Sequence, residues 1–189
     1  NDGKLGLNQS EPVKISSPKQ VGSGTDWAVV SSQSKHVVAT KTDGTLWAWG
    51  QNEQGQLGQN DKTQYSSPRQ VGSDTSWISA RANRNNAAIA TKTDGTLWTW
   101  GYNIPEGKLG LNNEVTYSSP IQIGTDTTWS QVATGIKSNS AIKSDGTLWS
   151  WGDNEYGELG HNSTSPGVSS PTQVASNVTT WKSITTGNA

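Results

Sequence analysis

The chain has 189 residues, a formal net charge of −1, ten tryptophans and no cysteine, phenylalanine or methionine. Such a balanced charge gives no general attraction to nucleic acid or acidic membranes, and the lack of cysteine excludes disulfides and thiolate metal sites. No apolar run approaches the roughly 18 residues that a membrane-spanning helix needs. We therefore expect a domain with a real core, no nucleic-acid partner and no membrane insertion.

One pattern recurs along the whole chain with a period of about 51 residues. Trp47, Trp98 and Trp149 are spaced by 51 residues each, and the Ser-Ser-Pro and Leu-Gly sequences keep nearly the same step. A fixed period of this length is typical of repeat architectures. We divide the chain, as a single propeller segment covering 1–189, into units 1–51, 52–102, 103–153 and an incomplete 154–189.

The first unit illustrates the elements expected in each. It begins with a Gly-rich loop over 1–8, whose Leu5 is expected to point inward. Ser16-Ser17-Pro18 then opens a short strand at 19–21, and because proline is tolerated at a strand's start or on an exposed edge, this strand should be outermost. Three further strands are predicted, over 27–31, 36–41 and 46–49.

The last two strands of the unit are joined by Asp43-Gly44, which predicts a tight two-residue hairpin turn with positive φ at both positions. In the strand that follows, alternation sends Trp47 and Trp49 to one face and their neighbours Leu46 and Ala48 to the other. Both faces of such a sheet must be covered, which copies of the same unit can do.

Four antiparallel strands in each unit predict an all-β protein built of β-propeller blades. With the outer strand placed first, the chain reads as three complete sets and two further strands, or fourteen strands and about three and a half blades.

KTDGTLWAWGQNEQGQLG at 41–58 and KSDGTLWSWGDNEYGELG at 143–160 resemble the repeat of the regulator of chromosome condensation family. The resemblance implies rings that usually have seven blades, so we expect this chain to be part of a larger seven-bladed propeller, cut within a longer protein. It also implies a histidine eight residues before each hairpin glycine. Only His36 fits, because Ala87 and Ser138 stand at the corresponding positions.

Candidate catalytic groups are sparse. His36 and His161 are the only imidazoles and have no metal-ligating companions in sequence, and we expect His36 to bond the backbone of a neighbouring blade. Turn formation accounts for Asp43, Asp94 and Asp145. Since nucleotide-binding loops and nucleophile elbows are also missing, we expect no enzyme, no metal and no cofactor.

The tryptophans allow two interpretations, because exposed indoles bind sugars and bases whereas buried ones hold blades together. Their constancy between units, set against variable loops, favours packing. The predicted packing residues are Trp47, Trp49, Trp98, Trp100, Trp149 and Trp151.

Loops between the first two blade strands vary most and should gather on one rim, where binding residues often lie. The candidate contacts are Lys35, Arg81, Arg84, Asn85 and Lys137. We therefore expect a non-catalytic interaction or structural module for a protein or glycan, also contacting neighbouring propeller repeats of the same or another chain. Its expected setting is extracellular, on a cell surface or virion. The alternatives are a guanine-nucleotide exchange factor-like regulator of a small GTPase and a secreted enzyme inhibitor.

Overall fold

The computed structural model describes residues 3–9, 15–105, 107–164, 166–175 and 178–186. Twelve β-strands, and no helix, occur within these ranges. They are β1 (Trp27–Gln33), β2 (His36–Lys41), β3 (Leu46–Gly50), β4 (Tyr65–Gln70), β5 (Trp77–Asn83), β6 (Ala87–Lys92), β7 (Leu97–Gly101), β8 (Tyr117–Gln122), β9 (Trp129–Thr134), β10 (Ser138–Lys143), β11 (Leu148–Gly152) and β12 (Val168–Val174).

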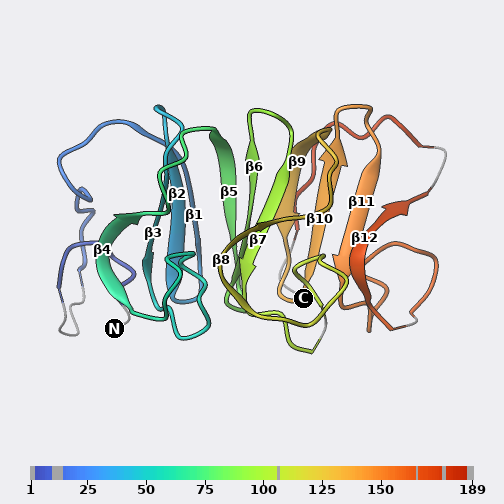
Figure 1. Ribbon diagram of the computed structural model, residues 1–189, viewed down its shortest axis with the longest axis horizontal. Coiled ribbons are helices and arrows are strands. Elements are labelled where there is room, and N and C mark those ends of the chain that lie inside the picture. Colours follow the sequence, from blue (N-terminus) through green and yellow to red (C-terminus); the bar gives the residue numbers. More distant parts are fainter. Residues whose placement is uncertain (1–2, 10–14, 106, 165, 176–177, 187–189) are drawn as a thin grey trace.

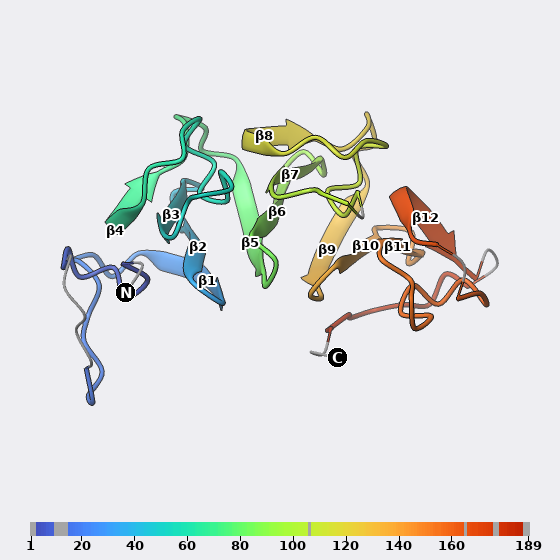
Figure 2. The same ribbon diagram turned by 90° about the horizontal axis from the view of Figure 1, so that it is seen from below.

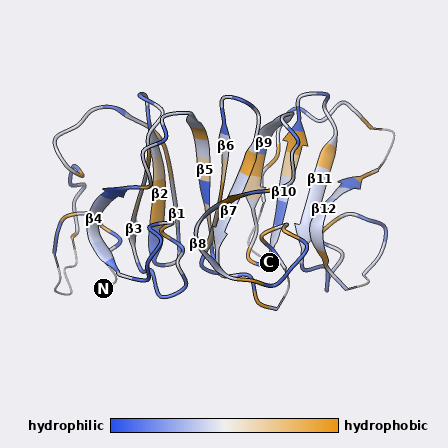
Figure 3. Ribbon diagram, in the orientation of Figure 1, coloured by the Kyte–Doolittle hydropathy of each residue, from blue (hydrophilic) through white to orange (hydrophobic). Residues whose placement is uncertain are grey.

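The strands form three antiparallel four-stranded sheets, β1–β4, β5–β8 and β9–β12, which we call blades 1, 2 and 3. The blades stand side by side in an arc, with β1, β5 and β9 on its inner side and β4, β8 and β12 on its outer side (Figures 1 and 2). Hydrophobic residues concentrate in the strands (Figure 3). The predicted all-β propeller fold is thereby confirmed.

Alternating strand direction sorts the connections onto two rims (Figure 1). One, here called the loop rim, carries the turns from the first to the second strand of each blade together with the long loops over 51–64, 102–116 and 153–167. The other, the turn rim, carries the Asp-Gly hairpins. All of the loops that vary most in sequence thus share one rim.

Two of the fourteen expected strands do not form. Residues 19–21 and the segment around Trp181 are irregular, because the strands that would pair with them in a further blade are not among the described residues. The second segment still runs beside blade 3: Trp181 N donates to Gly146 O (3.2 Å), and Thr186 Oγ1 donates to Thr134 O (2.5 Å).

The hairpin turns differ from the sequence prediction. Gly44 N donates to Lys41 O and Lys41 N donates to Thr45 O, both at 3.0 Å, which encloses a loop of three residues. Only Gly44 has a positive φ, at 77°, so the expected two-residue turn with two positive φ angles is wrong. The Asp43 carboxylate accepts hydrogen bonds from the Thr45 backbone N (2.9 Å) and Oγ1 (2.6 Å), which favours the longer loop.

The two larger core clusters lie between neighbouring blades, whereas a third, around Val37, Ala39 and Trp49, belongs to blade 1 alone. Val38, Leu46 and Ala48 of blade 1 pack with Trp77 and Trp100 of blade 2 in one cluster. Leu97 of blade 2 packs similarly against Trp151 of blade 3, so blade 2 is covered on both faces. Trp49, Trp100 and Trp151 are buried, whereas Trp47, Trp98 and Trp149 are half-buried.

The long loops of blades 1 and 2 are each fastened to the following blade. Leu57 of the first long loop is fully buried, and the Trp100 indole Nε1 donates to Gln56 O at 2.9 Å. Two residues beyond Gly58, Asn60 N donates to Ser118 O on the outer strand of blade 2 at 2.7 Å. Trp151 and Lys108 repeat the indole bond at 2.9 Å. The Leu-Gly dipeptides at 57–58 and 109–110 therefore belong to the interfaces between blades. Leu5 of the first such dipeptide is 44% exposed, so the expectation that it points inward is wrong.

Candidate functional site: the loop rim

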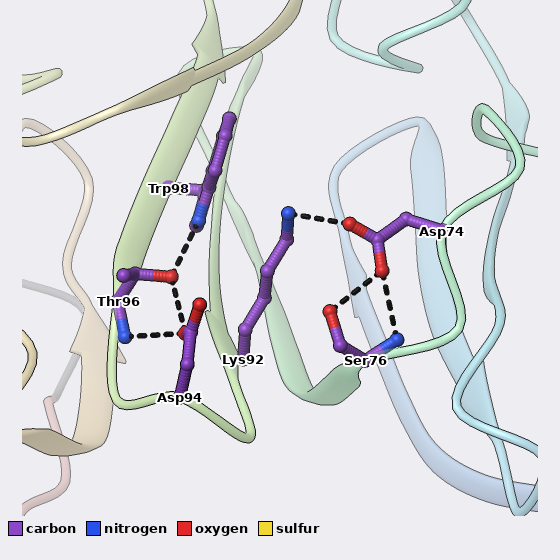
Figure 4. A network of polar contacts seen from close by, with 6 residues as sticks. All are labelled: Asp74, Ser76, Lys92, Asp94, Thr96 and Trp98. Atoms are coloured by element: carbon purple, nitrogen blue, oxygen red, sulfur yellow. Dashed lines mark hydrogen bonds and ion pairs between the residues drawn. The ribbon is translucent and has the colours of Figure 1, made fainter.

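A lysine, a carboxylate and the Trp98 indole form a compact cluster on the turn rim of blade 2 (Figure 4), and a second indole, Trp77, has its ring centroid 4.6 Å from the lysine Nζ. Lys92 Nζ lies 2.6 Å from Asp74 Oδ2 and 3.8 Å from the Trp98 ring centroid. Hydrogen bonds from Lys92 and then Ser76 lower the pKa of the Asp74 carboxyl from 3.8 to about 2.

The same cluster recurs in the other blades, through Lys41 with Asp26 (3.1 Å) and Lys143 with Asp126 (2.5 Å). Its charges are paired internally and its geometry repeats in every blade, so we assign it to the framework. Sequence reasoning missed this cluster, although the recurrence of these lysines with the repeat was a visible signal.

The two histidines occupy different environments. His36 lies on β2 opposite Gly50 and is fully buried; burial lowers its pKa from 6.5 to about 4 and outweighs the Ala87 backbone of blade 2, which raises it. Neither ring nitrogen reaches a partner among the described residues with good hydrogen-bond geometry, so the contact with Ala87 is weak. His36 fills an interface between blades rather than a site open to solvent.

His161 forms a pair with a serine that the sequence did not reveal. Its Nε2 lies 2.9 Å from Ser150 Oγ, which also donates to Leu159 O at 2.7 Å. A carbonyl can only accept, so the hydroxyl hydrogen is directed to Leu159 and the imidazole donates to Ser150. This arrangement holds the loop and leaves no base facing the hydroxyl.

Other candidate chemistry is absent from the described part of the chain. It contains no group of three or more His, Asp or Glu residues that could hold a metal ion. Among the same residues, no helix is long and apolar enough to cross a membrane. Each hairpin carboxylate of Asp43, Asp94 and Asp145 accepts hydrogen bonds from the threonine two residues later.

The five predicted contact residues all belong to the loop rim or the strand end that leads to it. Lys35 and Arg84 are exposed, while Arg81, Asn85 and Lys137 are partly buried. Arg81 Nη1 donates to Ala80 O (3.1 Å), and Lys137 Nζ pairs with Asp153 Oδ2 (3.3 Å). Lys35 and Arg84 are thus the most accessible cations of the predicted set.

Hydrogen bonds join the short turns of the loop rim to one another and to the long loops. Asn83 Nδ2 donates to Gly135 O at 2.8 Å, which links the turns of blades 2 and 3. Within blades 1 and 3, Gln51 N donates to Lys35 O (3.0 Å) and Asp153 N donates to Lys137 O (3.2 Å). The short turns of blades 2 and 3 are therefore connected, and in blades 1 and 3 the short turn is bonded to the start of its own long loop.

A cavity of about 430 Å³ opens between the long loops of blades 2 and 3. It could not be read from the sequence, because its walls come from two loops that differ from each other and from the first long loop. The lining residues are Pro105, Asn112, Asn113, Glu114, Asp153, Pro166, Gly167 and Ser169.

Fold and repeats together define a β-propeller of short tandem units, and comparison with known families gives its affiliation. The model of the regulator of chromosome condensation (RCC1) repeat matches residues 43–83, 94–142 and 145–189, and a second model of this repeat matches 29–56 and 129–158. The chain belongs to the RCC1 repeat family.

Several curated proteins are similar in sequence. Human Protein RCC2 is 38% identical over 141 residues, which are 71% of this chain and 26% of the relative. The ultraviolet-B receptor UVR8 of Arabidopsis thaliana is 29% identical over 162 residues, 84% of this chain and 37% of the receptor. This chain thus spans about a quarter of the length of RCC2.

Solved structures agree on the fold. Human WBSCR16 superposes with a TM-score of 0.79 at 24% identity, covering 92% of this chain and 46% of that chain. Yeast RCC1 (Prp20), in a structure with Kap60, superposes with a TM-score of 0.72 at 22% identity, covering 90% of this chain and 41% of that chain.

The comparisons overturn the expected extracellular, cell-surface or virion setting. Prp20p from Saccharomyces cerevisiae superposes with a TM-score of 0.67 at 21% identity, covering 79% of this chain and 38% of that chain, and was described with its binding properties to Gsp1p and histones. Histones are chromatin proteins, and the family itself is named for chromosome condensation. Nothing in these relatives supports a secreted or virion-exposed protein.

Proposed function

We propose that this chain is a non-catalytic protein-interaction segment of an RCC1-repeat propeller, with the loop rim as its contact surface. The observation that carries this proposal is the separation of the two rims: the repeated hairpins and lysine clusters occupy one, and the variable loops occupy the other. Rigid frameworks commonly carry their binding residues on such loops.

The loop-rim side chains differ between blades where the framework around them does not. Arg81 pairs with Ile89 in blade 2, and the corresponding residues are Ser31 in blade 1 and Ala133 in blade 3. Blades 1 and 3 pack with a serine or an alanine at this position, so blade packing does not require the arginine. We therefore expect Arg81 to act in partner binding rather than in stability.

Regulation of a small GTPase, in the manner of an exchange factor, is the second candidate function. It is favoured by the likeness to Prp20p, which was described with its binding to Gsp1p as well as to histones. Loop-rim contacts would serve either function, because an exchange factor must also grip a protein surface.

The test is binding of the whole protein to an immobilised small GTPase and, separately, to histones. We expect Lys35→Glu with Arg84→Glu to weaken whichever interaction occurs at least tenfold while the melting temperature stays nearly unchanged. The control variant is Lys182→Glu. Lys182 is exposed and follows Trp181, and the Trp181 backbone N donates to Gly146 O in a hairpin of the turn rim. Equal binding by the two variants would contradict the proposal. Nucleotide release from the GTPase then separates regulation from simple binding.

A further inference from the structure

We infer that the cavity between the long loops of blades 2 and 3 receives an arginine or lysine side chain of a partner protein, flanked by apolar residues of the same segment. This inference rests on the proposed interaction function and specifies where on the loop rim a cationic segment is held.

The cavity has acidic groups on both of its walls. Glu114 of the blade 2 loop is exposed, while the Asp153 side chain at the base of the blade 3 loop is 17% exposed. Because Lys137 Nζ lies 3.3 Å from Asp153 Oδ2, the charge of Asp153 is partly balanced already. Glu114 is therefore the main attraction for an incoming cation, and a volume of about 430 Å³ accommodates a long side chain.

Hydrogen bonds hold the cavity walls in place. Asn113 Oδ1 accepts from Val115 N at 2.9 Å, and Asn113 O accepts from Asn103 Nδ2 at 2.8 Å. The blade 2 loop is joined to the outer strand of blade 3, β12, where Asn112 N donates to Ser169 O at 2.7 Å. A preformed site of this kind loses little conformational freedom when a ligand enters.

The two loops that form the cavity also carry exposed apolar side chains. Ile104 is 45% exposed beside Pro105, and Val115 is 53% exposed beside Glu114. Tyr156, on the third long loop, is 80% exposed. In the first long loop, 51–64, every residue is described and none is an exposed large hydrophobic. Arginine and lysine side chains can bury their methylene groups on an apolar surface while the charged end reaches a carboxylate. A carboxylate next to exposed apolar side chains therefore suits either of them.

The corresponding junction between blades 1 and 2 lacks these features. By the matching hydrogen bonds of the two loops, Lys62 takes the place of Glu114, and Tyr102 takes the place of Asp153. The framework is the same at both junctions, but Lys62 and Tyr102 replace both acids of the cavity walls. The carboxylate that the first junction does have, Asp61 in place of Asn113, already accepts hydrogen bonds from Asn52 and Tyr65. The acidic cavity is therefore not a requirement of the blade fold.

The inference can be tested with a labelled pentapeptide, Gly-Leu-Arg-Val-Gly, and its twin carrying neutral citrulline in place of arginine. Fluorescence anisotropy at low salt should show saturable binding of the arginine peptide to the whole protein and at least tenfold weaker binding of the citrulline peptide. Glu114→Lys should weaken the arginine peptide at least tenfold, whereas Lys62→Glu should not weaken it. Since Glu114→Lys installs the residue already present at the equivalent position, the melting temperature should barely change.

Absence of arginine-peptide binding up to millimolar concentration, equal binding of the two peptides, or indifference to Glu114→Lys would each overturn the cavity assignment. Those results would leave the wider proposal standing if Lys35→Glu with Arg84→Glu still weakened a protein partner. Conversely, the arginine peptide could bind specifically while Lys35→Glu with Arg84→Glu leaves binding of the protein partner unchanged. That result would support the cavity assignment and would exclude the rest of the loop rim from the interface.

Discussion

Gly55 packs directly against the backbone of Ser118 in the next blade: a β-carbon at position 55 would stand 2.6 Å from the Ser118 α-carbon. Gly3 meets Ser66 in the same way, also at 2.6 Å. These contacts explain why the Gly-x-Leu-Gly loops at 3–6 and 55–58 are each followed by a Ser-Ser-Pro strand about 60 residues later, since the glycine lets the loop lie flat on the outer strand of the following blade.

Replacing Gly55 by alanine should therefore cost more than the same change at Gly157. Both glycines have positive φ, 74° and 78°, so both variants pay roughly 1–2 kcal/mol for a left-handed alanine. Only Gly55 adds a backbone clash, because the nearest atom to a β-carbon at Gly157 is Thr164 Cγ2 at 3.7 Å. Urea unfolding should show the larger loss for Gly55→Ala. Equal losses would mean that the close approach to Ser118 has no energetic weight.

The two tryptophans of one strand should differ in their importance. Trp100 is fully buried and donates to Gln56 O, so Trp100→Ala should destabilise by about 3–5 kcal/mol, the range for aromatic truncation in a core. Trp98 is half-buried under Lys92, and its truncation should cost less. The comparison needs chemical unfolding of both variants under the same conditions, and a greater loss at Trp98 would contradict the interface described above.

His36 should make stability fall in mild acid. Its pKa is lowered from 6.5 to about 4 in the fold, so an unfolded chain binds a proton more readily. The contribution of neutral His36 is complete above pH 6.5 and is lost as the pH falls to about 4, to a total of about 3 kcal/mol. In His36→Ser, the new residue is the one that the equivalent position 138 already carries. This variant should make the free energy of unfolding depend less on pH between 6.5 and about 4. An unchanged slope would place the acid sensitivity elsewhere.

The ion pair between Asp74 and Lys92 should matter at neutral pH and disappear at strongly acidic pH. The Asp74 pKa is lowered from 3.8 to about 2, so its contribution is present above pH 3.8 and lost as the pH falls to about 2. Because the carboxylate is 40% exposed, solvent screening limits the effect of Asp74→Asn to about 1 kcal/mol. Thermal melts at pH 7 and pH 2 test this, and an equal loss at both would mean the pair contributes nothing.

Much of the fold follows from the sequence because the repeat fixes so many positions at once. The strand boundaries at His36–Lys41 and Leu46–Gly50 agree with the sequence to within one residue, since alternation and the Asp-Gly pair define them. The turn type was missed because Asp-Gly suits both a two-residue and a three-residue hairpin, and the bonds from Asp43 to Thr45 decide between them.

Features made by two different loops were beyond prediction. The cavity joins Glu114 to Asp153 through loops that are far apart in the sequence and unlike each other, so no single motif announces it. The pair of Ser150 on β11 and His161 was equally hidden, because their approach depends on the path of the third long loop. By contrast, Lys92 and Asp74 could have been noticed, because equivalent residues recur in every unit.

The most direct test of the loop rim is a hydrogen-exchange footprint of the whole protein with a bound small GTPase or bound histones. We predict that protection appears in the short turns at 33–35, 83–86 and 135–137 and in the long loops, while the hairpins at 42–44, 93–95 and 144–146 exchange as in the free protein. Protection confined to those hairpins would place the interface on the turn rim and contradict the account.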